Sequence, residues 1–186
     1  PTSTPEGCVG ASQAVAITVV PFPTMLSASS ATTCSGSSVN LVLSVDITST
    51  YSWLASDNIN VGGESLLAQS SGTIGDVLTN TSGAIQTVNY TVTPTSTPEG
   101  CVGASQAVNI TVNPAPVMLS ANTATICSGD AVNLALSADI ASTYSWLASD
   151  NVNVGGESLL AQSGGTIGDI LTNTSGAIQT VNYTVT

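Results

Sequence analysis

The sequence predicts an all-β protein made of tandem β-sandwich domains, and three observations support this fold class. Residues 1–93 and 94–186 are the same sequence written twice, with differences at only 15 of the 93 aligned positions. Apolar residues recur with a period of two, which is typical of strands with one buried face. Helical periodicity is absent from any segment of about ten residues, so crossover helices between parallel strands are not expected.

The period-two segments predict the strands, and glycine-containing pairs between them predict the turns. The segment 54–73 is the least regular and predicts a long connection with one short edge strand. The apolar positions that define the strands are Val15, Ile17 and Val19; Val39, Leu41, Leu43 and Val45; and Val88, Tyr90 and Val92.

Two proline motifs, Pro21-Phe22-Pro23 and Pro114-Ala115-Pro116, mark the predicted domain edges. Proline fixes φ, so each motif predicts a short, stiff joint in an extended beads-on-a-string array. Residues 21–113 then form a complete domain, and residues 1–20 carry the last strand of a preceding domain. Residues 114–186 form a domain without its last strand, which exposes an unpaired edge. We expect Ala11–Val20 of the next repeat or the next copy to fill this gap.

The charge composition excludes several classes of partner and reaction. The chain has 11 acidic residues, no Lys, Arg or His, and a formal net charge of −11. Nucleic acids and anionic membranes are bound mainly through Lys and Arg, so neither is an expected partner. Without a His or Lys base, only two paired carboxylates would support acid-base catalysis, and no pair stands in a pocket-like context. We therefore predict no catalytic residues and no enzyme activity.

Several motifs together resemble the PKD-like repeats of the Bacteroidota. The resemblance covers both repeats and implies an Ig-like β-sandwich. Such repeats occur in very long secreted surface proteins, including adhesins linked to gliding motility, which implies an extracellular location at the cell surface. The resemblance identifies no ligand. Its motifs are Thr33-Cys34-Ser35-Gly36, Tyr51-Ser52-Trp53, Leu78-Thr79-Asn80-Thr81, Gln86–Thr95, Gly100-Cys101 and Ile110–Pro114.

The four cysteines, Cys8, Cys34, Cys101 and Cys127, occupy equivalent positions in the two repeats. No C-x-x-C pair and no His is present, so disulfides in an oxidising, extracellular compartment are expected before zinc. The preferred pairing joins Cys34 to Cys101 within one domain, and Cys127 to Cys8 of the following copy. An Ig-like strand order leaves an alternative, in which Cys34 bonds to the Gly-Cys loop of the next domain.

One loop in each repeat clusters oxygen ligands that suit calcium, which prefers six to eight oxygens. Its spacing does not match an EF-hand, and Asp and Asn are also ordinary turn formers, so we prefer the reading of a simple turn. No other cofactor is predicted. The candidate calcium ligands are Asp57, Asn58, Asn60 and Glu64, and in the second repeat Asp150, Asn151, Asn153 and Glu157.

The function predicted from these features is mechanical: a structural repeat unit of a secreted filament or adhesin stalk, giving reach and stiffness. The alternative is a multivalent module in which each repeat binds carbohydrate or another surface weakly and repetition supplies avidity. Trp53 and Trp146 bear on this choice, because an exposed Trp can stack on a sugar. We expect both to lie in the core, where an aromatic packs between two sheets.

Overall fold

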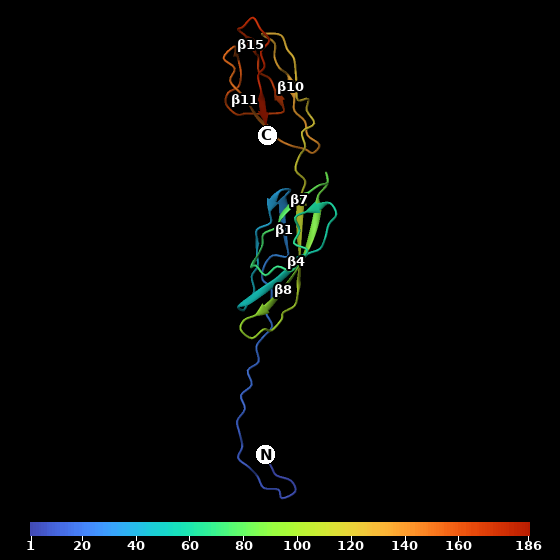
Figure 1. Cartoon of the computed structure of the whole chain (residues 1–186), viewed down its shortest axis with the longest axis vertical. Coiled ribbons are helices and arrows are strands. Elements are labelled where there is room, and N and C mark those ends of the chain that lie inside the picture. The colour runs from blue at the N-terminus through green and yellow to red at the C-terminus, as the bar shows by residue number, and fades with distance from the viewer.

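The computed structural model describes all residues, 1–186, and contains strands but no helix. No helix that could span a membrane is therefore present. Three parts follow one another along the long axis of the molecule (Figure 1). They are an N-terminal segment (residues 1–20), domain 1 (residues 21–113) and domain 2 (residues 114–186).

Domain 1 is a sandwich of two β layers. The first layer is a four-stranded sheet in which β1 pairs parallel with β9 and the other neighbours pair antiparallel. The second layer consists of two small antiparallel groups. The first layer has the order β1 (Ser30–Cys34), β9 (Gln106–Asn113), β8 (Gln86–Ser96) and β4 (Ser49–Ala55), and the second contains β2 (Ser37–Ser38), β7 (Val77–Asn80) and β5 (Val61–Gly62), with β3 (Leu41–Val42) beside β6 (Thr73–Ile74).

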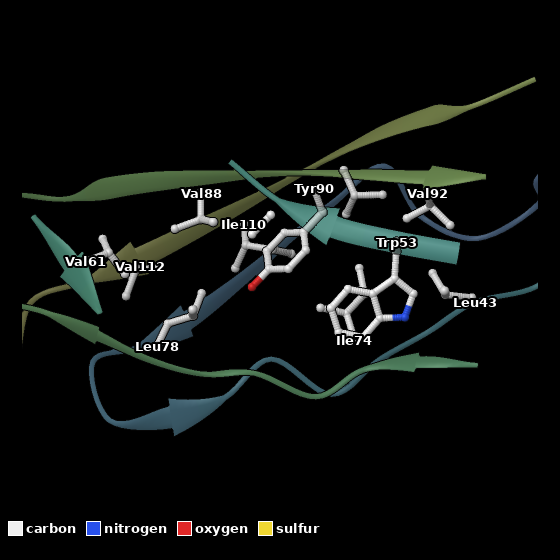
Figure 2. Packing of buried hydrophobic residues seen from close by; sticks show 12 residues of the cluster. Leu43, Trp53, Val61, Ile74, Leu78, Val88, Tyr90, Val92, Ile110 and Val112 are labelled. Carbon is white, nitrogen blue, oxygen red and sulfur yellow. The ribbon is translucent and has the colours of Figure 1, made fainter. Parts of the chain in front are cut away.

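Twelve buried hydrophobic residues fill the space between these layers. Val88, Tyr90 and Val92 of β8 are fully buried and alternate with exposed residues, which confirms the predicted period of two. Figure 2 shows Tyr90 and Trp53 projecting from one layer toward the other, with Trp53 beside Ile74.

The predicted strand through Val39–Val45 is wrong in one respect, because Asn40 interrupts it. Asn40 has a φ of 51°, in the left-handed region that Asn tolerates better than most residues. Leu41 and Leu43 still face inward, so the burial pattern survives although the regular strand is limited to β2 and β3. The least regular segment, 54–73, overlaps the end of β4 and the start of β6, and between them it contains only the short strand β5, as predicted.

Domain 2 repeats this arrangement less completely, with seven strands where domain 1 has nine, and residues 123–127, the counterpart of β1, form no regular strand. No segment of the chain takes the place that β9 has in domain 1, and only three hydrophobic residues form its buried cluster, Leu136, Trp146 and Ile167. Its strands are β10 (Leu134–Ala135), β11 (Ser145–Ala148), β12 (Val154–Gly155), β13 (Gln162–Ser163), β14 (Thr166–Ile167), β15 (Thr172–Asn173) and β16 (Tyr183–Val185).

The N-terminal segment forms no strand, although Val15, Ile17 and Val19 have the period-two pattern. Their side chains are 73%, 80% and 86% exposed. The identical residues one repeat later, in β9, form a strand because β1 and β8 lie on either side of them. A strand needs partners for its backbone groups, and this chain holds none for residues 11–20.

Candidate functional site: the open groove of domain 2

Domain 2 contains a groove with a volume of about 720 Å³. Its walls include residues 123–127, the counterpart of β1, and residues 179–183, the counterpart of the first part of β8. In domain 1, β9 lies between the two corresponding strands. The groove is therefore the space that a last strand would occupy.

Core residues of domain 2 are partly open along this groove. Val181, Tyr183 and Val185 are half-buried, whereas their counterparts in β8 are fully buried. Leu171 is likewise half-buried, and its counterpart Leu78 is fully buried. Apolar surface left open in this way retains the free-energy cost of its hydration, so the groove favours an apolar occupant.

The groove also presents a side-chain amide with an unused donor. In domain 1, Nδ2 of Asn80 donates to the carbonyl oxygens of Ala84, at 2.8 Å, and of Val112 in β9, at 2.9 Å. In domain 2, Nδ2 of Asn173 keeps the first of these bonds, to the Ala177 carbonyl at 2.8 Å. No carbonyl takes the place of Val112, although Asn173 lines the groove. The amide is thus positioned to receive a strand backbone.

A tyrosine and a carboxylate link the two layers in each domain, and the tyrosine is buried in domain 1 and half-buried in domain 2. The Tyr90 hydroxyl donates to Oδ2 of Asp76 at 2.7 Å, and Ser65 donates its backbone amide and hydroxyl to the same carboxylate at 2.8 Å each. Burial, assisted by the hydrogen bond to Asp76, raises the pKa of Tyr90 well above its ordinary value. In domain 2 the Tyr183 hydroxyl donates to Asp169 at 2.9 Å.

Sequence reasoning missed this network. Asp76 follows Gly75 and resembles an ordinary turn residue, and nothing local to it points to Tyr90 on a strand in the other layer. The arrangement has no cationic group, and the nearby Glu64 carboxylate accepts a hydrogen bond from the Asn58 amide. Its contribution is structural, because it holds a buried hydroxyl against a fixed acceptor.

The two tryptophans lie in the core, as predicted. Trp53 is 3% exposed and packs edge-on against Tyr90, with ring centroids 5.8 Å apart. Trp146 is 6% exposed and packs in the same way on Tyr183. Neither ring presents a face on which a sugar would stack.

The environments of the two indole N–H groups differ. Nε1 of Trp53 donates to the carbonyl of Ser71 at 3.0 Å, whereas the buried Nε1 of Trp146 has no partner. The residue equivalent to Ser71 is Gly164, whose φ of 143° only glycine adopts readily. Because the loop follows a different path at Gly164, no carbonyl oxygen accepts a hydrogen bond from Nε1 of Trp146.

The candidate calcium loop is held by its own hydrogen bonds. The backbone amide of Asn58 donates to Glu64 at 3.1 Å, and the amide of Asn60 donates to the Asn58 side chain at 3.0 Å. Asn58 also donates to the Thr87 carbonyl at 3.0 Å. Asn151, Asn153 and Glu157 repeat these contacts in domain 2.

These contacts are those of a turn, and Asp57 and Asp150 take no part in them. No three carboxylate, Cys or His side chains gather anywhere in the chain. The loop therefore has no preformed cluster of calcium ligands, and calcium binding there stays a prediction.

The predicted disulfide between Cys34 and Cys101 is wrong in this structure, where all four cysteines, including Cys8 and Cys127, are free thiols. Cys34 pairs with Asn113 at one end of β9, whereas Cys101 precedes Gln106 at the other end. A strand rises roughly 3.3 Å per residue, so the intervening length of β9 exceeds the 4.4–6.8 Å between the Cα atoms of a disulfide several-fold. The alternative, a bond between Cys34 and the Gly-Cys loop of the next domain, stays a prediction.

Comparison with known families agrees with this architecture. A family model described as PKD-like domain matches the chain twice, over residues 31–116 and 124–186. The second match ends with the chain, before any counterpart of β9. A search of curated proteins finds no match to the chain.

Proposed function

Because this chain belongs to the PKD-like domain family, we propose that it is a structural repeat unit of a secreted cell-surface filament or adhesin stalk. Domains of this family are Ig-like modules and are typically extracellular. The proposed work is to provide reach and stiffness, and it involves no catalysis.

The observation that carries the proposal is the way each proline joint is fixed to the domain that follows it. After Pro21-Phe22-Pro23, the amide of Thr24 donates to Oδ1 of Asp46 at 2.8 Å, and the amide of Asp46 donates back to the Thr24 carbonyl at 3.2 Å. This hydrogen bond from Thr24 lowers the pKa of Asp46 below its ordinary value.

The second joint repeats this arrangement. The amide of Val117 donates to Asp139 at 2.8 Å, and the amide of Asp139 donates to the Val117 carbonyl at 3.0 Å. Each joint contains two prolines, and the residue after it is hydrogen-bonded to an aspartate of the following domain. Such a joint has few conformations, so we expect it to transmit force rather than to bend freely. The two domains accordingly follow each other along the long axis (Figure 1).

The surface chemistry supports the same role. With a net charge of −11 and no Lys or Arg, neighbouring domains repel each other, which favours an extended array. The absence of basic residues also leaves no cleavage site for trypsin-like proteases. The multivalent carbohydrate-binding alternative has no specific support here, because both tryptophans are buried.

The test is to measure contour length by electron microscopy and small-angle scattering for chains of two, four and eight repeats. A stalk requires a constant increment of length for each added repeat, with a persistence length greater than one domain. Compact particles whose size grows with the cube root of mass would contradict the proposal. Affinity for glycans that rises steeply with repeat number would favour the multivalent module instead.

A further inference from the structure

We infer that the groove of domain 2 is a docking site for the N-terminal segment of a second copy of this chain, whose Gln13–Val20 completes the sandwich as its last strand. The inference goes beyond a stalk role, because it specifies a partner, a binding site and a register.

Domain 1 shows what occupies such a groove. The residues of β9 that enter the core are Val108, Ile110 and Val112, all fully buried. The N-terminal segment carries the identical residues at the equivalent positions, Val15, Ile17 and Val19, and they are exposed and unpaired. Residues 1–186 therefore contain a groove that lacks a strand and a segment with the matching residues that lacks sheet partners.

The differences between the two strand sequences fall where the groove tolerates them. Only two positions of Gln13–Val20 differ from β9: Ala16 replaces Asn109, and Val20 replaces Asn113. Asn109 is exposed, and Asn113 is the half-buried last residue of β9. Every side chain that enters the core is unchanged.

The pairing in domain 1 defines the register of the incoming strand. Val88 lies opposite Ile110 in the antiparallel pair, which places Ile17 opposite Val181. On the other side, Cys34 lies beside Asn113 in the parallel pair, which places Val20 beside Cys127.

Two hydrogen bonds of domain 1 would be recreated by this register. The unused donor of Asn173 would meet the carbonyl of Val19, as Asn80 meets that of Val112. The backbone amide of Ser128 would meet the carbonyl of Val20, as the amide of Ser35 donates to the Asn113 carbonyl at 2.8 Å.

The loop that precedes the incoming strand is already folded as it is in domain 1. Residues 1–10 pair Thr2 with Val9, and residues 94–103 pair Thr95 with Val102. The amide of Ser3 donates to the Cys8 carbonyl at 3.0 Å, and the equivalent bond in domain 1 measures 2.9 Å. A segment with its loop formed in advance loses less conformational entropy on docking.

The chain cannot fill its own groove without rearrangement, because domain 1 lies between the N-terminal segment and domain 2 (Figure 1). The donor strand and the groove are different surfaces at opposite ends of the molecule, so the contact is heterologous. Such contacts produce open, head-to-tail chains when the rotation does not close a ring. We therefore expect linear oligomers rather than a closed dimer.

The experiment is sedimentation velocity on the full 186-residue chain over a wide concentration range, with two matched variants. Ile17→Asp places a charge at a position that enters the core, and Ala16→Asp adds the same charge at an outward position. Both residues lie outside the two domains, so neither variant disturbs their folding. We expect elongated oligomers from the wild type and from Ala16→Asp, and at least a hundred-fold weaker association from Ile17→Asp.

A second measurement uses a synthetic peptide of residues 1–20 with the monomeric Ile17→Asp chain, whose groove is intact. The peptide should bind saturably, and the same peptide carrying the Ile17→Asp change should not. A wild-type chain that stays monomeric and does not bind the peptide would overturn the inference. Association that persists unchanged in Ile17→Asp would also overturn it, since it would show a different interface. Both assays measure docking and do not measure length or stiffness. A negative result would therefore not contradict the stalk proposal, which the contour-length measurement tests separately.

Discussion

Domains 1 and 2 have nearly the same sequence, yet twelve hydrophobic residues form the buried cluster of the first and three form that of the second. The substitutions between the repeats do not account for this, because the core positions Val88, Tyr90 and Val92 recur unchanged as Val181, Tyr183 and Val185. The main difference is the presence of β9 in domain 1. In domain 1 the folding unit is thus offset from the sequence repeat by about twenty residues, because this sandwich takes its last strand, β9, from the second repeat.

The largest expected difference comes from the same substitution made in the two copies of this strand. Ile110→Ala removes a fully buried side chain from β9 and should destabilise domain 1 by about 2–5 kcal/mol. Ile17→Ala, in the exposed copy, should change domain stability by less than about 0.5 kcal/mol in dilute solution. Urea-dependent hydrogen exchange, measured separately on peptides from each domain, checks both values. Equal effects would show that residues 11–20 are packed in the isolated chain.

The tyrosine network predicts a dependence of stability on alkaline pH. The pKa of Tyr90 is raised in the folded state by burial and by Asp76, so the unfolded chain loses this proton first. The stabilisation is complete below the unfolded pKa of about 10 and decreases above it, by up to about 1.4 kcal/mol per pH unit. Tyr90→Phe should cost about 1.5–3 kcal/mol at neutral pH, because it removes a hydrogen bond to a carboxylate.

The same variant should flatten the decrease above pH 10, and denaturant titrations at several pH values would measure this. Tyr183→Phe is the matched change in domain 2, where the same network is half-buried. It should have the smaller effect at each pH. A Tyr90→Phe protein with an unaltered alkaline profile would show that another group causes the loss of stability.

A smaller difference is expected between Asn80→Ala and Asn173→Ala. Both variants lose the loop hydrogen bond to Ala84 or Ala177, but only Asn80→Ala also leaves the carbonyl of Val112 without its donor. We expect Asn80→Ala to cost about 1 kcal/mol more than Asn173→Ala. Adding a saturating peptide of residues 1–20 should remove most of this difference, and thermal unfolding with and without the peptide would detect it.

The smallest expected effect is that of calcium. The loop that contains Asn58 and Glu64 satisfies its own hydrogen bonds, so EDTA should shift the melting midpoint of either domain by less than about 1 °C relative to millimolar calcium. Differential scanning calorimetry with magnesium as a control provides the test. A calcium-specific rise of several degrees would establish a site at this loop.

The sequence was informative where local pattern and packing agree. The alternation at Val88, Tyr90 and Val92 predicted a buried strand face, and the tyrosine-tryptophan motif predicted core aromatics. It failed where the outcome depends on pairing between distant segments. The parallel register of β1 on β9 separates Cys34 from Cys101, and no local signal in the sequence reveals that register.

The groove was predictable only in part. Comparing the repeats indicated a missing strand, since Gln106–Asn113 has no counterpart after Thr186. The role of Asn173 was not predictable, because the unused donor becomes visible only when Asn80 is seen bound to the Val112 carbonyl. The break at Asn40 was hidden by the period-two alternation of its neighbours, although Asn tolerates the left-handed φ that it adopts here.

The most direct test is amide hydrogen exchange of residues 179–185 in the monomeric Ile17→Asp chain, with and without a saturating peptide of residues 1–20. We predict fast exchange for the amides that face the groove in the free chain. Protection should rise to the level of residues 86–92 once the peptide is bound. Residues 179–185 that are already as protected as residues 86–92 without the peptide, or that gain nothing from it, would contradict the account.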